Sequence, residues 1–476
     1  MIKKLPIIKS IFIFAIPILF ANLISSGYQL VDAFWVGRLG PLAVAGVANA
    51  GSIMFLMMSI GIGFSIAGGA LTAQYFGAKD QKMINKTSAQ TILASVLASI
   101  ILSLIAFFSL KPFFRLIDVP SDVLPYALSF AKVALIGTVF NFAFMMFQSV
   151  MRPIGEMRTP IYIGLLSVAL NFFFDPFFIF GFHSIPAMGV SGAAMATIVT
   201  QSIAAAIGFY ILFNGKHGIK LHLKDFVPDF SFIKRTFFLG LPGSIEMGSR
   251  SFSSVILMFL VNIFGGTAIA AYGVGGNVFI LTTIMPCMAF SIAVSILVGH
   301  KLGAGDKKSA REVANLGMFI TFIIVAFFSV FAFIFAKNLL QFFIPNDSSI
   351  LELGIFYLRV IALAAPLISL QFSASAILRA SGNMMSSMMV SLISIWALQI
   401  PIAFYLSKYA GYGVKGVYIS GLFSSFLIGI FIIFYLKYNK WENKNLIKNI
   451  NNDQDKNKDN ILKKDIEEEM LIDIAR

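Results

Sequence analysis

The chain has 476 residues, of which 58% are hydrophobic and only 12% are charged. A soluble protein of this length would carry about twice that charged fraction. A lipid bilayer explains the deficit, because each charge at the centre of a spanning helix costs about 2.5–3.5 kcal/mol. The composition therefore argues against a soluble protein of several domains and predicts an integral membrane protein.

The formal net charge of +14 does not indicate a nucleic-acid partner, because the basic residues lie between apolar runs and form no single patch. Membrane proteins use such residues to fix their orientation. The single cysteine, Cys287, cannot form a disulfide within the chain. The four histidines show no metal-ligand spacing, so the sequence predicts no cofactor and no certain metal site.

Twelve apolar runs are long enough to cross about 30 Å of hydrocarbon. The first six span roughly residues 11–36, 44–73, 87–110, 123–150, 159–181 and 189–213. The other six span roughly residues 233–262, 268–299, 314–336, 350–377, 384–406 and 413–436. We therefore expect an all-α membrane protein with an N-terminal six-helix lobe (1–213), a cytoplasmic linker (214–232), a C-terminal six-helix lobe (233–438) and a disordered cytoplasmic tail (439–476).

The charges between these helices alternate along the chain. The intervals after even-numbered helices are rich in Lys and Arg, for example Lys79, Arg152, Lys301 and Arg379, and the intervals after odd-numbered helices hold far fewer. Since cytoplasmic loops carry the excess of Lys and Arg, both termini are predicted to be cytoplasmic. The even number of helices agrees with this, because it places both termini on the same side of the membrane.

Four short motifs recur at an offset near 225 residues. Each repeat then holds six helices, so both halves enter the membrane in the same direction and are parallel repeats, whose substrate site lies between the halves. The paired motifs are Ile16-Pro17 with Leu241-Pro242, Phe76-Gly77-Ala78-Lys79-Asp80 with Leu302-Gly303-Ala304-Gly305-Asp306, Met151-Arg152-Pro153-Ile154-Gly155 with Leu378-Arg379-Ala380-Ser381-Gly382, and Met188-Gly189-Val190-Ser191-Gly192 with Tyr412-Gly413-Val414-Lys415-Gly416.

Over residues 10–437 the sequence resembles multidrug and toxic compound extrusion (MATE) transporters. The resemblance implies two six-helix lobes around a central cleft, and export of small organic compounds, cationic ones among them, in exchange for H⁺ or Na⁺. The motifs that carry it, besides the repeats, are Val31-Asp32-Ala33-Phe34-Trp35-Val36-Gly37, Asn171-x-x-x-Asp175-Pro176 and Gly189-x-x-Gly192-Ala193-Ala194-x-Ala196-Thr197.

Asp32 lies past the middle of the first predicted helix. Tyr28 is one turn earlier and shares its face, with Gln29 nearby. Desolvation favours the protonated form of an unpaired carboxyl, whereas a bound cation would keep it ionised. Acids within membranes usually mark transport pathways, so we expect Asp32 to carry a proton or Na⁺. The alternative is an acid that reaches the outer interface near Arg38.

Asp175 in the fifth predicted helix lies one turn after Asn171 and directly before Pro176. This spacing puts an amide and a carboxylate on one face. They can supply oxygen ligands for a hard cation, or hydrogen bonds that hold the acid in its protonated form. The resemblance implies that Asp32, Asn171, Asp175 and Thr197 form the cation-coupling site of the N-terminal lobe. The alternative is a polar cluster that only fastens the first and fifth helices together.

Pro17 interrupts the hydrogen bonding of the first helix before Asp32. The resemblance suggests that this helix bends there when the coupling site changes protonation, whereas a proline near a helix start can also be without function. In the seventh helix, Glu246 and Arg250 are one turn apart and form a predicted ion pair. They serve either as substrate contacts, with Tyr28 and Gln29, or as a structural pair.

These features predict a monomeric, multi-pass exporter in a bacterial plasma membrane, in contact with membrane lipids and driven by H⁺ or Na⁺ entry. The absence of a Walker motif argues against an ATP-driven pump, and no Ser/His/Asp constellation indicates an enzyme. Two alternatives stay open: a flippase for lipids or polyisoprenoid-linked compounds, and a membrane scaffold without transport activity.

Overall fold

A computed structural model describes residues 5–183, 186–343, 347–444 and 446–447. Within these residues twelve helices are long and apolar enough to span a membrane, which confirms the predicted all-α architecture. The spans begin and end within a few residues of most predicted boundaries. The largest extensions, of six or seven residues, are at the starts of the first, third and ninth spans and at the end of the third.

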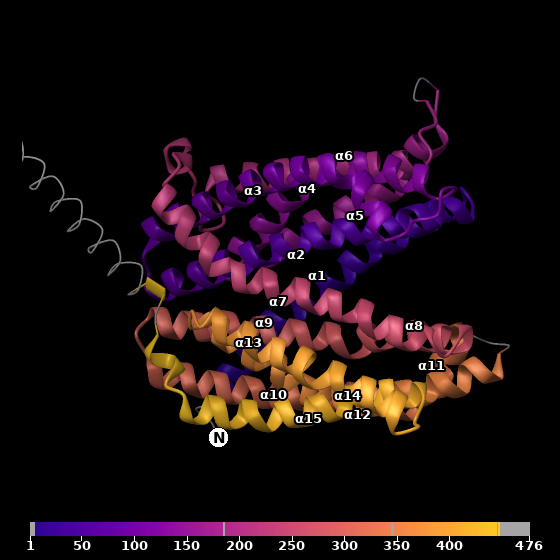
Figure 1. The fold of residues 1–476 in the computed structure, drawn as a ribbon. Coiled ribbons are helices and arrows are strands. Elements are labelled where there is room, and N and C mark those ends of the chain that lie inside the picture. The colour runs from indigo at the N-terminus through magenta and orange to yellow at the C-terminus, as the bar shows by residue number, and fades with distance from the viewer. Residues whose placement is uncertain (1–4, 184–185, 344–346, 445, 448–476) are drawn as a thin grey trace, which may run out of the picture.

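The chain forms two groups of helices that lie one above the other in Figure 1. Each group holds six of the spans, as the repeated motifs predicted. The N-terminal lobe consists of α1 (Leu5–Gly37), α2 (Pro41–Gly77), α3 (Gln81–Leu116), α4 (Leu124–Met151), α5 (Arg158–Phe180) and α6 (Val190–Asn214).

The C-terminal lobe has the same order of spans, but two of them contain π-helical turns. A π turn at Ile280–Ile284 joins α8 to α9, and π turns at Ile393–Gln399 and Tyr405–Tyr409 flank α14. Its helices are α7 (Phe230–Asn262), α8 (Gly266–Phe279), α9 (Met285–Gly303), α10 (Lys307–Ile334), the short α11 (Ala336–Phe343), α12 (Ser348–Ala380), α13 (Met384–Leu392), α14 (Ile400–Phe404) and α15 (Val414–Tyr438).

The repeated motifs have the same local structure in both lobes. Asp80 caps α3 by accepting a hydrogen bond from Met83 N, and Asp306 caps α10 in the same way through Ser309 N. Gly189 and Gly413 precede α6 and α15 with a φ of 58°, a conformation that side chains disfavour. The motifs therefore recur because each lobe needs the same capping aspartate and the same glycine with positive φ to begin the equivalent helices.

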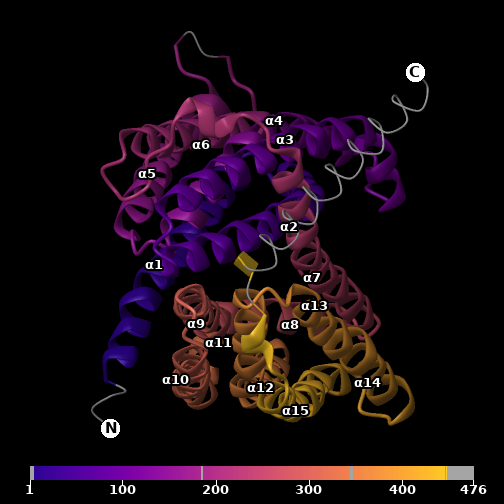
Figure 2. The same ribbon diagram turned by 90° about the vertical axis from the view of Figure 1, so that its left-hand side faces the viewer.

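The first helix of each lobe begins against the other lobe. The first half of α1 packs on α9, where Ile11 and Ala15 contact Phe290 and Ala293, and its second half packs on α5. The first half of α7 likewise packs on α2. Figures 1 and 2 show α1 and α7 crossing between the two groups. Pro17 lies where α1 changes from one lobe to the other.

The two lobes meet closely at the end of the bundle where α2 and α9 end. A Cβ added to Gly77 would collide with the His300 carbonyl, and one added to Gly303 would collide with the Gln74 carbonyl. Only glycine at both positions allows this approach. Two related hydrogen bonds also cross the junction, from Gln74 Nε2 to the Ala380 carbonyl (2.7 Å) and from His300 Nε2 to the Pro153 carbonyl (2.6 Å).

The predicted linker is fastened to α3. Asp229, the N-cap of α7, accepts a hydrogen bond from Lys86 Nζ at 2.8 Å, and Gln90 Nε2 donates to the carbonyls of Asp225 and Val227. These bonds hold the chain on the surface of the N-terminal lobe as it passes to the C-terminal one.

The predicted disorder of the tail from residue 439 is wrong for its first part. Trp441 is buried in the C-terminal lobe, and Glu442 forms an ion pair with Arg311 at 3.0 Å. Leu446 is buried against Gly382, and its N–H donates to Gln74 Oε1 at 3.0 Å. Two apolar anchors within a polar sequence order this segment. Residue 445 and residues 448–476 lie outside the described residues.

Candidate functional site

One face of α5 is buried and becomes polar at its centre. From Ile163 on, its buried residues recur every four positions, which places them on one stripe. The stripe begins and ends with isoleucines and has a hydroxyl, an amide and a carboxyl between them: Ile163, Ser167, Asn171, Asp175 and Ile179. This stripe faces α1 and α6, the two helices that pack along α5.

The second half of α1 brings Asp32 to this polar stripe. The Asp32 carboxyl interacts with the Asp175 carboxyl and with the side chains of Asn171 and Thr197. Asn171 Nδ2 donates a hydrogen bond to Asp175 Oδ1 at 3.2 Å. The structure therefore brings together all four residues of the expected coupling site, from α1, α5 and α6.

Tyr28 extends the cluster toward α6. Its hydroxyl forms a hydrogen bond with Thr200 Oγ1, and it also interacts with Asp32, Thr197 and Asp175. Thr200 is fully buried and was not predicted from the sequence, although it lies three residues after Thr197 on the same helix. Gln29, in contrast, is exposed and forms no hydrogen bond with a described residue.

The acids of this cluster have no cationic partner in the part of the chain that the structure describes. Arg38, the nearest candidate along α1, stacks instead on the rings of Phe34 and Trp35, at 4.4 and 4.6 Å from their centroids. Pairing with Arg38 at the outer interface, the alternative for Asp32, therefore does not occur.

Several oxygen atoms of the cluster are buried and lack a hydrogen-bond partner among the described residues. They are Asp32 Oδ1, Asn171 Oδ1, Asp175 Oδ2 and Ser167 Oγ. Leaving a buried acceptor unsatisfied costs about 1–3 kcal/mol. The two carboxyls can share one proton between them. Carboxylate, amide and hydroxyl oxygens are also the ligands that hard cations prefer. The residue types thus fit H⁺ or Na⁺ as the bound ion.

The C-terminal lobe buries a different acid cluster. Glu246 is only 1% exposed, and Arg379 Nη1 lies 3.2 Å from both of its carboxylate oxygens. The hydroxyls of Ser387 and Ser391 donate to the same carboxylate at 2.9 and 2.8 Å. The predicted partner Arg250 is at 3.4 Å, with its guanidinium also over the Phe372 ring.

Arg379 is a residue of this cluster that its place in the sequence does not reveal. The charge pattern predicts a loop residue, but Arg379 lies in the last turn of α12 with its side chain only 13% exposed. Together Glu246 and Arg379 fasten α7 to α12, and the serines add α13. Two arginines neutralise this carboxylate, so within the described residues Glu246 differs from the acids of the N-terminal lobe, which have no cationic partner.

Comparison with known proteins agrees with this geometry. The sequence profile of the MatE family matches residues 17–177 and 242–405, one segment in each lobe. The chain is 27% identical over 442 residues to the probable multidrug resistance protein YoeA of Bacillus subtilis, covering 92% of this chain and 95% of that protein. It is 26% identical to the probable multidrug resistance protein NorM of Thermotoga maritima, covering 92% and 93%.

Solved structures share the fold. An outward-facing multidrug resistance MATE family transporter superimposes with a TM-score of 0.83 at 21% identity, covering 90% of this chain and 95% of that chain. A variant of the Vibrio cholerae MATE transporter VcmN superimposes with a TM-score of 0.85 at 18% identity, covering 93% and 100%. Both likenesses concern the arrangement of helices.

Proposed function

The chain belongs to the MatE family of membrane transporters, and from this premise we propose that it is a secondary active exporter. It moves small organic compounds, cationic ones among them, out of the cell in exchange for entering H⁺ or Na⁺. The observation that carries this proposal is the cluster around Asp32 and Asp175. The buried Asp175 faces Asp32, whose Oδ1 is also buried, and neither acid has a cationic partner among the described residues.

Two carboxyls so close cannot both ionise cheaply unless they bind a cation. With one proton shared between them, or with Na⁺ on their oxygens, the cluster loses its excess negative charge. Without the ion, the like charges repel. Ion binding therefore changes how tightly α1, α5 and α6 hold together, and this supplies the differential interaction that a two-state carrier needs.

α1 is the element that could pass this change to the rest of the protein. Its second half carries Tyr28 and Asp32, and its first half packs on α9 of the other lobe. Pro17 lies between the halves, where a missing backbone hydrogen bond makes bending easier. In this proposal, ion binding bends α1 and so alters the contact between the lobes, which exposes the substrate alternately to either side.

The energy available from one entering charge is adequate. When the substrate is neutral, a potential of 100 mV supplies about 2.3 kcal/mol for one entering charge, which supports roughly fiftyfold accumulation. Exchange of one H⁺ or Na⁺ for a monovalent organic cation moves no net charge, so the concentration gradient of the ion drives it. The junction at Gly77 and Gly303 closes one end of the bundle, where the basic intervals lie. By the positive-inside rule, this end and both termini face the cytoplasm of a cell whose plasma membrane holds the protein, which we propose to be bacterial. Because the closed end is then the cytoplasmic one, the arrangement is outward-facing.

The test uses the purified full chain in proteoliposomes with an imposed H⁺ gradient or an imposed Na⁺ gradient, each applied alone. Accumulation of a fluorescent organic cation such as ethidium is measured for the parent and for Asp32→Asn. We expect one of the gradients to drive accumulation in the parent and neither to drive it in the variant. Equal accumulation by both proteins would show that Asp32 does not couple transport.

A further inference from the structure

A cavity of about 980 Å³ opens at the seam where α1 leaves its own lobe and packs on the other. Both lobes line it, at the ends of α2 and α9 and the starts of α1, α3 and α10. This end of the bundle is the proposed cytoplasmic side, so the cavity lies at the depth of the inner lipid headgroups. The assignment of that depth rests on the proposed function.

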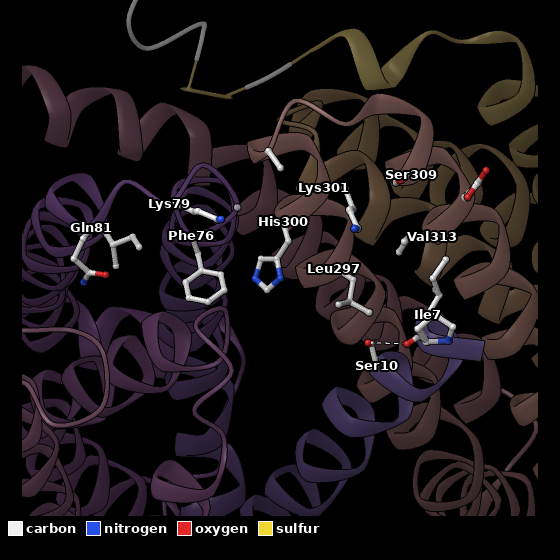
Figure 3. Close-up of a pocket in the computed structure, with 15 residues that line it drawn as sticks. Ile7, Ser10, Phe76, Lys79, Gln81, Leu297, His300, Lys301, Ser309 and Val313 are labelled. Carbon is white, nitrogen blue, oxygen red and sulfur yellow. Dashed lines mark hydrogen bonds between the residues drawn. The ribbon is translucent and has the colours of Figure 1, made fainter. Parts of the chain in front are cut away.

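Two lysines project into this cavity. Figure 3 shows the ammonium ends of Lys79 and Lys301 on either side of the His300 ring. Neither ammonium forms an ion pair or a hydrogen bond with a described residue, although Asp306 is within electrostatic range of Lys301. Glu312 also lines the cavity, so its lysines and acid together carry one net positive charge.

Apolar side chains lie beneath these charges. Leu297 is one turn before Lys301 on the same face of α9, and Phe76, Ile84 and Val313 add to the wall. α1 contributes Ile7, which lies close to Leu297 and Val313 in Figure 3. A site with a basic rim over an apolar wall at a membrane surface suits a ligand that is anionic at one end and apolar at the other.

We propose that this seam cavity binds an anionic phospholipid of the inner leaflet. The phosphodiester lies between Lys79 and Lys301, because an ammonium is a good point charge for phosphate. Glu312 accepts hydrogen bonds from headgroup hydroxyls, and the start of an acyl chain lies along Leu297 and Ile7. Basic pockets between membrane helices on the cytoplasmic side are suited to such headgroups.

The second seam of the molecule provides a comparison. Its cavity of about 620 Å³, between α2, α3 and α7, is lined almost entirely by apolar side chains, with Lys234 as its one basic residue. That cavity can take hydrocarbon but offers no pair of cations for a phosphate. A pair of cations therefore distinguishes the first of these two cavities from the second.

The test is native mass spectrometry of the detergent-purified full chain titrated with phosphatidylglycerol. The test variant is Lys79→Asn with Lys301→Gln, in which asparagine tolerates the φ of 58° at position 79. The matched control is Lys82→Gln with Lys308→Gln, because both lysines are exposed at the same end of the bundle but do not line the cavity. Thermal unfolding without lipid checks that both variants fold.

We expect the affinity for phosphatidylglycerol to fall about 30-fold in the test variant, which corresponds to about 1 kcal/mol for each lysine. The control variant should keep the parent's affinity. An equal affinity in all three proteins would overturn the proposal, as would equal binding of phosphatidylethanolamine or displacement of the lipid by millimolar inorganic phosphate. This measurement needs no transport activity, so it can fail or succeed independently of the exporter proposal.

Discussion

Both lobes bury a carboxylate in their first helix, but they treat it in opposite ways. Asp32 faces another carboxyl and keeps an oxygen without a partner, whereas Glu246 is surrounded by two guanidinium groups and two hydroxyls. Relative to the repeated proline, Glu246 comes four residues later and Asp32 fifteen. The two acids are therefore at different depths, about 16 Å apart along a helix axis.

The difference separates an acid available for ions from an acid used for assembly. A charge that must bind and release an ion cannot be neutralised permanently, so it has to remain under-satisfied. A charge that fixes helices together needs all its partners, because a buried ion pair with a missing member is strongly destabilising. In the proposed function, the first helix of one lobe therefore carries the acid that couples transport, and the first helix of the other carries an acid that fastens helices together.

The largest effect is expected when one of the two carboxyls of the N-terminal lobe is replaced by an amide. In Asp175→Asn, accumulation driven by the ion gradient should fall to the level of protein-free liposomes, because the cluster no longer holds two carboxyls that can share an ion. Proteoliposome accumulation measures this, and the unfolding temperature serves as the control. We expect that temperature to stay the same or to rise, since the repulsion between the carboxyls is removed. Retained accumulation would contradict the assignment.

The reverse result is expected in the C-terminal lobe. Glu246→Gln leaves Arg379 and Arg250 without their carboxylate and should lower the free energy of unfolding by about 3–5 kcal/mol. Protein that still folds should respond to the same ion gradient as the parent. Adding Arg379→Gln should recover part of the stability. A stable Glu246→Gln variant without coupling would instead make Glu246 a coupling residue.

The glycines at the junction test whether the two lobes contribute equally to its closure. A Cβ in Gly303→Ala would meet the Gln74 carbonyl and should disfavour the closed junction by about 1–3 kcal/mol. Spin labels on cysteines replacing Lys82 and Lys308 should then report longer distances between the lobes. Gly51→Ala, where the added Cβ has nothing within 4 Å, is the control on α2. Gly77→Ala should act like Gly303→Ala if the two repeats contribute equally.

The smallest effect is expected at the half-buried ion pair between Lys86 and Asp229 of the linker. Partial burial alone would raise the pKa of Asp229, but the hydrogen bond and charge of Lys86 hold it below its ordinary value of 3.8. This stabilisation is present above that value and is lost as the pH falls through the lower folded pKa. Lys86→Gln should cost under about 1 kcal/mol at pH 7. Thermal unfolding should show the difference shrinking toward pH 3, and a pH-independent difference would exclude this pair as its cause.

The spans and the repeat could be predicted because hydropathy and glycine spacing are local properties of the sequence. The same is true of Asp32, Asn171 and Asp175, since a polar residue inside an apolar run is visible without a structure. Thr197 followed from family resemblance, and the structure places it beside Asp32. Helical spacing also placed Tyr28 correctly, but it could not distinguish it from the exposed Gln29.

The residues that were missed depend on contacts distant in sequence. Arg379 looks like a loop charge until α12 is seen to extend to Ala380 and to bring it to Glu246. Thr200 and Ser167 are ordinary polar residues until α1 packs beside them. The order after Tyr438 was missed because the composition there is polar, and composition does not show that Trp441 and Leu446 have pockets in the folded bundle.

The segment after α15 also determines where a purification tag can be joined. Trp441 anchors this segment in one lobe, and Leu446 N–H reaches Gln74 of the other, at the junction between them. A tag that replaces the chain directly after Tyr438 removes both anchors and leaves Gln74 Oε1 without its donor. A tag placed after Ile447 preserves them, so two preparations of the same transporter differing by nine residues would close with different strength.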